Sequence, residues 1–252
     1  MARPRKRHIQ VEMRFPKRGG KRPGAGRPAK GKRSSERHKK RPVHLGRHPV
    51  HVTSRFVEEL GTLRRRDIRL AIRWATLAIV KREDAFRIVH FSLQSNHLHM
   101  LVEAQNRETL ARGMQAFQIS AAKHINRAIG ERTGTRRKGK VFADRYHARE
   151  LTTPREVRHA LAYVLNNWRR HDEDRARTTR TWKLDPFSTA VDFGGWKELS
   201  DSPFLYKPPA GYLGFIVWRP KTWLLSEGWK KHGAISVFDV PGPWKPARIA
   251  TR

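Results

Sequence analysis

The sequence of 252 residues predicts an α+β fold, a ferredoxin-like split βαβ sheet with helices on one face. Three observations predict it. Apolar residues alternate along short segments, as in half-buried strands, and recur every three or four residues along longer ones, as in amphipathic helices. The two patterns follow one another as strand, helix, strand, strand, helix, strand, with a further helix after the last strand. A sheet with this order has helices on one face and an open second face.

The composition limits the partners and the chemistry. The chain has 55 Lys and Arg against 22 Asp and Glu, a net charge of +33, which indicates a polyanionic partner such as nucleic acid rather than a merely soluble basic protein. It has no cysteine, which excludes disulfides, thiolate metal sites and cysteine nucleophiles. No apolar run approaches membrane-spanning length and no secretory signal is present, so we expect a cytoplasmic protein with no membrane partner.

The chain divides into three parts by composition. Residues 1–46 are expected to be a disordered basic tail, since residues 1–47 hold eighteen Lys and Arg and few apolar side chains. Residues 19–28 contain a Gly-Arg-Pro segment around Arg27 that resembles a minor-groove-binding AT-hook; a solvated tail explains it equally well. Residues 47–171 carry the ordered pattern. Residues 172–252 are expected to be a linker followed by a Trp- and Pro-rich extension, whose aromatics either stack on bases or, as we favour, pack on the main domain.

The first half of the ordered pattern contains three strands and one helix. Val50 and Val52 alternate with polar residues, which predicts the first strand. A helix is expected at roughly 60–80. A strand at 86–93, with Val89, Phe91 and Leu93 on one side, precedes a short turn and the third strand, so the two should form a hairpin.

The third strand carries the first candidate site. Residues 94–103 read Gln-Ser-Asn-His-Leu-His-Met-Leu-Val-Glu, and alternation places His97 and His99 on one face and Leu98 and Met100 on the other. Two adjacent imidazoles suit a divalent metal and leave coordination positions open, as a catalytic metal requires. The His-x-His pattern alone also arises by chance, so the prediction depends on its context.

The second half contains a helix, a basic loop, a strand and a capped helix. The second helix is marked by Leu110, Met114, Phe117, Ala121 and Ile125. The loop at 130–140 follows, and its basic residues are expected to contact DNA; they are Arg136, Arg137, Lys138 and Lys140. A strand is expected within 141–151.

The capped helix displays a tyrosine. Thr153-Pro154-Arg155-Glu156 is a capping box with proline at the first helical position. An apolar stripe follows, formed by Val157, Leu161, Val164, Leu165 and Trp168. His159, Tyr163 and Asn167 are spaced by four and share a different face.

Together these motifs resemble the HUH single-tyrosine transposases, in particular the REP-associated tyrosine transposase branch. The resemblance covers residues 47–171. It rests on residues 48–53 (His-Pro-Val-His-Val-Thr), 95–103 and 163–167 (Tyr-Val-Leu-Asn-Asn). The family pattern is His-hydrophobic-His followed about sixty residues later by Tyr-x-x-x-Gln or Tyr-x-x-x-Asn. This chain departs from the family in two places, because Asn167 replaces the Gln of insertion-sequence members and Trp168 replaces the usual Pro.

The resemblance implies metal-dependent cleavage and rejoining of single-stranded, hairpin-bearing DNA in the bacterial nucleoid. His97 and His99 would be metal ligands for Mg²⁺ or Mn²⁺, with Asn167 as a candidate third. Tyr163 would be the nucleophile that forms a 5′-phosphotyrosine. His159 is a candidate helper for the tyrosine, although a surface role explains it better. The resemblance leaves monomer and homodimer both open.

Two other functions remain open from the sequence. An RRM-like sheet could hold nucleic acid without chemistry, although such sheets usually stack bases on aromatics where this one carries His97 and His99. A domesticated transposase would keep the fold and lose mobility. A second tyrosine, Tyr146, competes with Tyr163, but its predicted strand position favours a structural role.

Overall fold

The computed structural model describes residues 42–82, 85–172, 184–201 and 211–242, so Arg27 and residues 1–41 of the basic tail lie outside the described part. Four strands form one antiparallel sheet in the order β2-β3-β1-β4. They are β1 (Val50–Arg55), β2 (Phe86–Leu93), β3 (His97–Ala104) and β4 (His147–Glu150). With the intervening helices this is the split βαβ topology, which confirms the predicted fold class.

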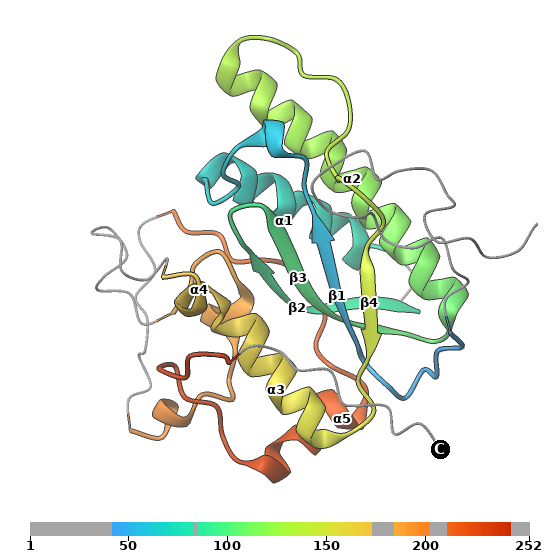
Figure 1. The fold of residues 1–252 in the computed structure, drawn as a ribbon, viewed down its shortest axis with the longest axis vertical. Helices are drawn as coiled ribbons and strands as arrows, with labels where there is room; N and C mark the ends of the chain where they lie inside the picture. The colour runs from blue at the N-terminus through green and yellow to red at the C-terminus, as the bar shows by residue number, and fades with distance from the viewer. Residues whose placement is uncertain (1–41, 83–84, 173–183, 202–210, 243–252) are drawn as a thin grey trace, which may run out of the picture. The chain divides into compact units, whose positions relative to one another are not determined.

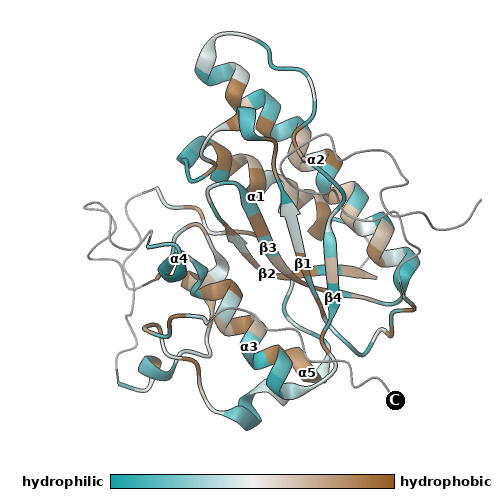
Figure 2. Ribbon diagram, viewed as in Figure 1, coloured by the Kyte–Doolittle hydropathy of each residue, from teal (hydrophilic) through white to brown (hydrophobic). Residues whose placement is uncertain are grey.

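Two long helices cover one face of the sheet (Figure 1). They are α1 (Arg66–Val80) and α2 (Arg107–Thr133). All five apolar residues that marked the second helix are buried, together with the matching face of the strands: Leu98, Met100 and Val102. Figure 2 shows β2 and β3 as hydrophobic along most of their length, while the loop after α2 is hydrophilic. The apolar residues that recur along the helices and those that alternate along the strands therefore pack together in one core.

The other face is not open, contrary to the expectation from topology. The helix α3 (Pro154–Leu165) lies against it, and its stripe residues Val157 and Leu161 pack with Leu101 of β3. Trp196 and Trp229, from the C-terminal part, join the same cluster. Periodicity reveals that a helix buries a stripe but does not reveal against which surface it does so.

The C-terminal part is tied to the domain by two buried carboxylates. Asp185 receives two hydrogen bonds from the guanidinium of Arg64, at 2.8 and 3.0 Å. Glu103 on β3 accepts from Arg87 at 2.9 Å and from the backbone and hydroxyl groups of Thr222 at 2.8 and 2.7 Å. Both carboxylates are fully buried, and buried charges persist only when paired in this way.

Short helical segments complete the described part. They are η1 (Glu58–Leu60), α4 (Asn167–Arg170), η2 (Thr189–Asp192), η3 (Lys197–Leu199), α5 (Trp223–Ser226) and η4 (Gly228–His232). Within the described ranges, none of the helices has both the length and the apolar character needed to cross a bilayer.

Several element boundaries differ from the sequence prediction. A β-bulge between Ile88 and His90 turns Val89 to the α3 side, away from Phe91 and Leu93. The first long helix begins at residue 66 rather than near 60, and α2 continues through Gly130 to residue 133. The last strand covers only four residues.

Candidate active site

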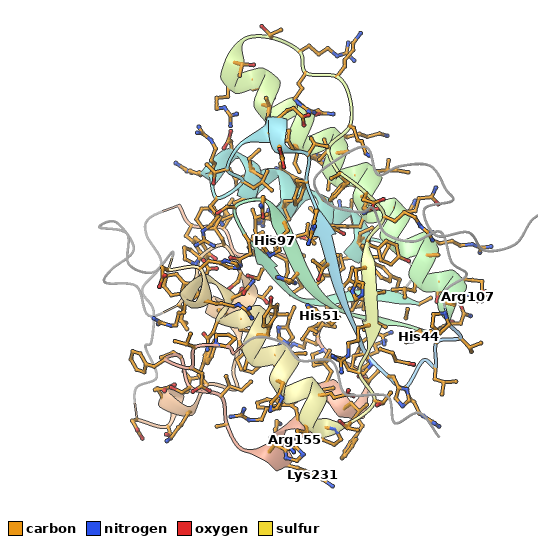
Figure 3. All side chains as sticks on the ribbon, viewed as in Figure 1. His44, His51, His97, Arg107, Arg155 and Lys231 are labelled. Atoms are coloured by element: carbon orange, nitrogen blue, oxygen red, sulfur yellow. The ribbon has the colours of Figure 1, made fainter. Side chains whose placement is uncertain are left out.

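The two histidines of β3 lie on the face of the sheet that α3 covers, because the ring of His99 lies 5.0 Å from that of Tyr163 on α3. His97 is labelled in Figure 3. Nε2 of His97 lies 3.0 Å from Nε2 of His99. The pairing of β1 with β3 places Thr53 opposite His99 and His51 opposite Leu101, so His51 and Thr53 share the same face. The site is thus built on the two central strands, where neighbours on both sides hold the backbone.

The other ring nitrogens of these histidines have hydrogen-bond partners. Nδ1 of His97 donates to Oδ1 of Asn96 at 2.7 Å. Nδ1 of His99 lies 3.1 Å from Oγ1 of Thr53 and 3.1 Å from Nε2 of His51. When Nδ1 of each ring carries the proton, both Nε2 lone pairs point into the same small space, which is how partners orient histidine ligands in metal sites.

Burial keeps the imidazoles neutral. Burial, with help from the positive charges of His171 and Arg55, lowers the pKa of His97 to about 4. Burial, and then the neighbouring His51, lowers the pKa of His99 well below its usual value. Burial, followed by His147 and Arg149, lowers the pKa of His51 to about 3. Neutral imidazole is the form that binds a metal.

Tyr163 from α3 lies directly over these histidines. Its ring centroid is 5.0 Å from that of His99 and 5.8 Å from that of His51, both edge-on. The guanidinium carbon of Arg170 lies 5.6 Å from the centre of the same ring. Burial raises the pKa of Tyr163, while the charge of Arg170 acts in the opposite direction. The phenol is therefore protonated at neutral pH, and Arg170 is placed to stabilise a phenolate.

Tyr163 and Asn167 do not lie on one continuous helix, contrary to the sequence prediction. The helix α3 ends at Leu165, and Asn166 leaves the helical conformation with φ −107° and ψ 13°. The side chain of Asn166 donates to the carbonyl of Ser236 at 2.9 Å, which supports this break. The family's usual Pro after the Asn is Trp168 here, and that side chain is fully buried.

Asn167 is fully buried, and within the described residues neither its amide nitrogen nor its amide oxygen has a hydrogen-bond partner. Leaving such a group unsatisfied costs about 1–3 kcal/mol. A buried amide oxygen without a hydrogen-bond partner could serve as a ligand to a divalent ion. In the described part of the chain, no three His, Cys, Asp or Glu side chains form a metal cluster.

The spacing of the histidine nitrogens fits a shared metal ion. Two nitrogens bound to one ion at about 2.1 Å and at right angles lie about 3.0 Å apart. The observed separation of 3.0 Å between His97 and His99 equals this value. Two neutral imidazoles at this spacing therefore suit a divalent ion that keeps open coordination positions.

The structure adds residues that the sequence reading did not assign to the site: His51, Thr53, His171 and Arg170. The ring of His171 lies 5.7 Å from that of His97. The strand pattern around His51 was visible in the sequence, but its register against β3 was not. That register is what brings His51 to His99.

Other candidates lie outside this cluster. Arg136, Lys138 and Lys140 are exposed on the loop after α2, and Arg137 binds Asn126 and the carbonyl of Lys140. His159 is exposed, and its charged neighbours are Arg155, Arg158 and His232. Tyr146 is buried in the core between the sheet and the long helices.

The fold and the site define a ferredoxin-like domain that sets a His-x-His strand beside a helical tyrosine. Residues 63–167 match the family model "Transposase IS200 like". The match spans His97, His99, Tyr163 and Asn167 and confirms the family expected from the motifs. No curated protein matches the chain. A solved structure of a REP-associated tyrosine transposase bound to a REP hairpin is similar, with a TM-score of 0.43, 14% identity and coverage of 74% of this chain and 99% of that one.

Proposed function

We propose that this protein is a metal-dependent transposase that cleaves and rejoins hairpin-associated single-stranded DNA through a 5′-phosphotyrosine. One observation carries the proposal. The ring of Tyr163 lies 5.0 Å from the ring of His99, and Nε2 of His99 lies 3.0 Å from Nε2 of His97. A tyrosine, two neutral imidazoles and the guanidinium of Arg170 therefore lie together on one face of the sheet, which supports the proposed roles of nucleophile, metal ligands and stabilising cation.

His97 and His99 would hold the metal ion, with Asn167 as the third protein ligand. A bound Mg²⁺ or Mn²⁺ would supply Lewis-acid polarisation of a non-bridging phosphate oxygen. The protein's own contribution is orientation, because Asn96 and Thr53 hold the outer nitrogens of the two rings.

Tyr163 would attack phosphorus through Oη. The bond from Oη to phosphorus forms and the bond from phosphorus to the 3′-oxygen breaks, so the DNA leaves with a protonated 3′-hydroxyl and its 5′-phosphate stays on the tyrosine. The phenolic proton has to leave during this step, and the positive charge of Arg170 beside the ring favours its departure. Reversal by another 3′-hydroxyl rejoins DNA, so the exchange needs no external energy source.

DNA is the partner that the charge of +33 favours, and the proposal places the protein with the bacterial nucleoid as a monomer or a homodimer. The exposed residues Arg136, Lys138 and Lys140 are the proposed backbone contacts near the domain, and Arg27 a contact in the tail. An RRM-like binding module without chemistry is less well supported, because α3 buries the sheet face on which bases would stack.

Trapping the covalent intermediate tests the proposal. The protein is incubated with end-labelled hairpin DNA and Mn²⁺ or Mg²⁺, and the adduct is separated under denaturing conditions. Wild type should form an adduct whose nucleotide maps to Tyr163 by mass spectrometry. Tyr163→Phe should abolish it and keep the fold, whereas Tyr146→Phe should still form it. A nucleotide on Tyr146, or an undiminished adduct from Tyr163→Phe, would overturn the assignment.

A further inference from the structure

A cavity lies at the opposite end of the central strands from the histidines. Its volume is about 650 Å³, which is within the usual range for small-ligand sites. It is lined by Gly46, Arg47, His48, Arg87, Thr152, Lys221, Thr222, Trp223 and Leu224. The segment that matches the transposase family covers residues 63–167, so most of this lining, including Arg47, Lys221 and Trp223, comes from outside it.

The lining combines positive charge with an exposed indole. Arg47 and Lys221 contribute positive charge, Arg87 is paired with Glu103, and none of the described residues that line the cavity is acidic. Trp223 is 53% exposed although it is one of the largest apolar side chains. The ammonium of Lys231 lies 5.1 Å from the centre of the Trp223 ring. Cations beside an exposed aromatic ring are the combination with which proteins hold single-stranded nucleic acid.

The cavity is built on a fixed support. Glu103, fully buried behind it, accepts hydrogen bonds from the backbone N–H groups of Lys221 and Thr222 at 3.0 and 2.8 Å. The same carboxylate pairs with Arg87 at 2.9 Å. Because β3 holds Glu103, the segment that carries Trp223 is fastened directly to the central sheet.

Three elements run from this cavity to the candidate active site. Arg47 and His48 precede β1, which carries His51. Glu103 is four residues beyond His99 on β3, a distance of about 13 Å. Thr152 precedes α3, and Tyr163 lies about 16 Å further along that helix. Figure 3 shows Arg155 and Lys231 together at this end of α3, away from His51 and His97.

We propose that this cavity binds one nucleotide of the single-stranded flank of the DNA whose phosphodiester lies at Tyr163. The base stacks on Trp223, and Arg47 and Lys221 contact the backbone phosphates. A few nucleotides of extended strand span the separation between the two sites. The inference rests on the proposed function for the position of the DNA, and it adds a flank-reading subsite to which the C-terminal part of the chain contributes Lys221, Thr222, Trp223 and Leu224.

Flank-dependent affinity tests the inference without requiring any chemistry. Binding of two labelled DNAs to the full chain is measured by fluorescence anisotropy in EDTA: a hairpin without a flank, and the same hairpin with a single-stranded flank longer than about 16 Å. Wild type should bind the flanked DNA more tightly. Trp223→Leu should lose about fivefold or more of that gain, whereas Trp223→Phe, which keeps a stacking ring, should retain most of it. Lys221→Met should lose part of the gain.

The control is Trp74→Leu, which removes an indole of similar exposure, 49%, from α1. It should leave the flank-dependent gain unchanged. The inference is overturned if wild type gains nothing from the flank, or if Trp223→Leu behaves like Trp74→Leu. Covalent adduct formation is assayed separately with metal present. A missing adduct together with a Trp223-dependent flank effect would refute the proposed chemistry and leave the subsite standing.

Discussion

Replacing Glu103 by glutamine should destabilise the protein strongly. The Glu103 carboxylate is fully buried and accepts hydrogen bonds from Arg87, Lys221 and Thr222. Glutamine has nearly the same shape, but its amide nitrogen is a donor that would face other donors. The charge of Arg87, whose side chain is 12% exposed, would also lose its counter-charge.

The expected loss follows from these contacts. Removing one partner of a buried ion pair costs about 3–5 kcal/mol, since the remaining charge stays desolvated. For a chain of this size each kcal/mol lowers the melting temperature by about 2–4 °C, so Glu103→Gln should melt about 6–20 °C below wild type. Urea unfolding followed by circular dichroism gives the free energy of unfolding directly.

The matched control is Glu131→Gln on α2. Glu131 pairs with Arg127 at 2.8 Å, but the two side chains are 64% and 77% exposed. Water screens such a pair, so the loss should stay within about 0.5 kcal/mol. If Glu103→Gln cost less than about 1 kcal/mol, Glu103 would not be the anchor of the C-terminal part, and the argument from its burial would be refuted.

Three further predictions concern pH, metal and salt. Burial lowers the pKa of His90 to about 4, so between about pH 4 and 6.5 the unfolded chain binds more protons than the folded one, and the free energy of unfolding falls as pH drops through that window. In urea unfolding measured across this range, His90→Gln should reduce the fall by up to about 3 kcal/mol. Parallel plots of unfolding free energy against pH for the two proteins would contradict this. In calorimetric titration, Thr53→Val should weaken Mn²⁺ affinity about 10–100-fold, because His99 loses an orienting hydrogen-bond partner, and His99→Ala should weaken it more. Equal Mn²⁺ affinities for wild type and His99→Ala would exclude the site. Deleting residues 1–41, which hold seventeen Lys and Arg against two Glu, should reduce the slope of log K against log salt for DNA binding, and an unchanged slope would show that the tail makes no DNA contact.

The sequence by itself determined the order of elements and the residue types of the site. Alternation along 97–102 placed His97 and His99 on the face opposite Leu98 and Met100, and the structure confirms this division. The cap at Thr153 likewise starts α3 where the motif predicted, with the Thr153 hydroxyl accepting from the N–H of Glu156 at 3.2 Å. Such features depend on neighbours within a few residues, and local sequence specifies them.

Helix and strand lengths were only partly determined. The side chain of Glu156 bonds to the backbone of Thr152 rather than to that of Thr153, and α3 ends before Asn167. The stop at Asn166 depends on the carbonyl of Ser236, seventy residues away. A helical repeat of three to four residues carries no information about such a partner, so the spacing of apolar residues did not indicate that the helix ends before Asn167.

Only the tertiary structure decided what surrounds the histidines. The register of β1 against β3 brings His51 and Thr53 to His99, and a one-residue slip would have turned both side chains to the other face. The packing of α3 on Leu101 turns Tyr163 toward the same point. The buried carboxylate of Glu103 fastens Thr222, and with it Trp223, at the far end of β3. These contacts join residues far apart in the chain, and they form because burying apolar surface and pairing buried charge select one arrangement of elements.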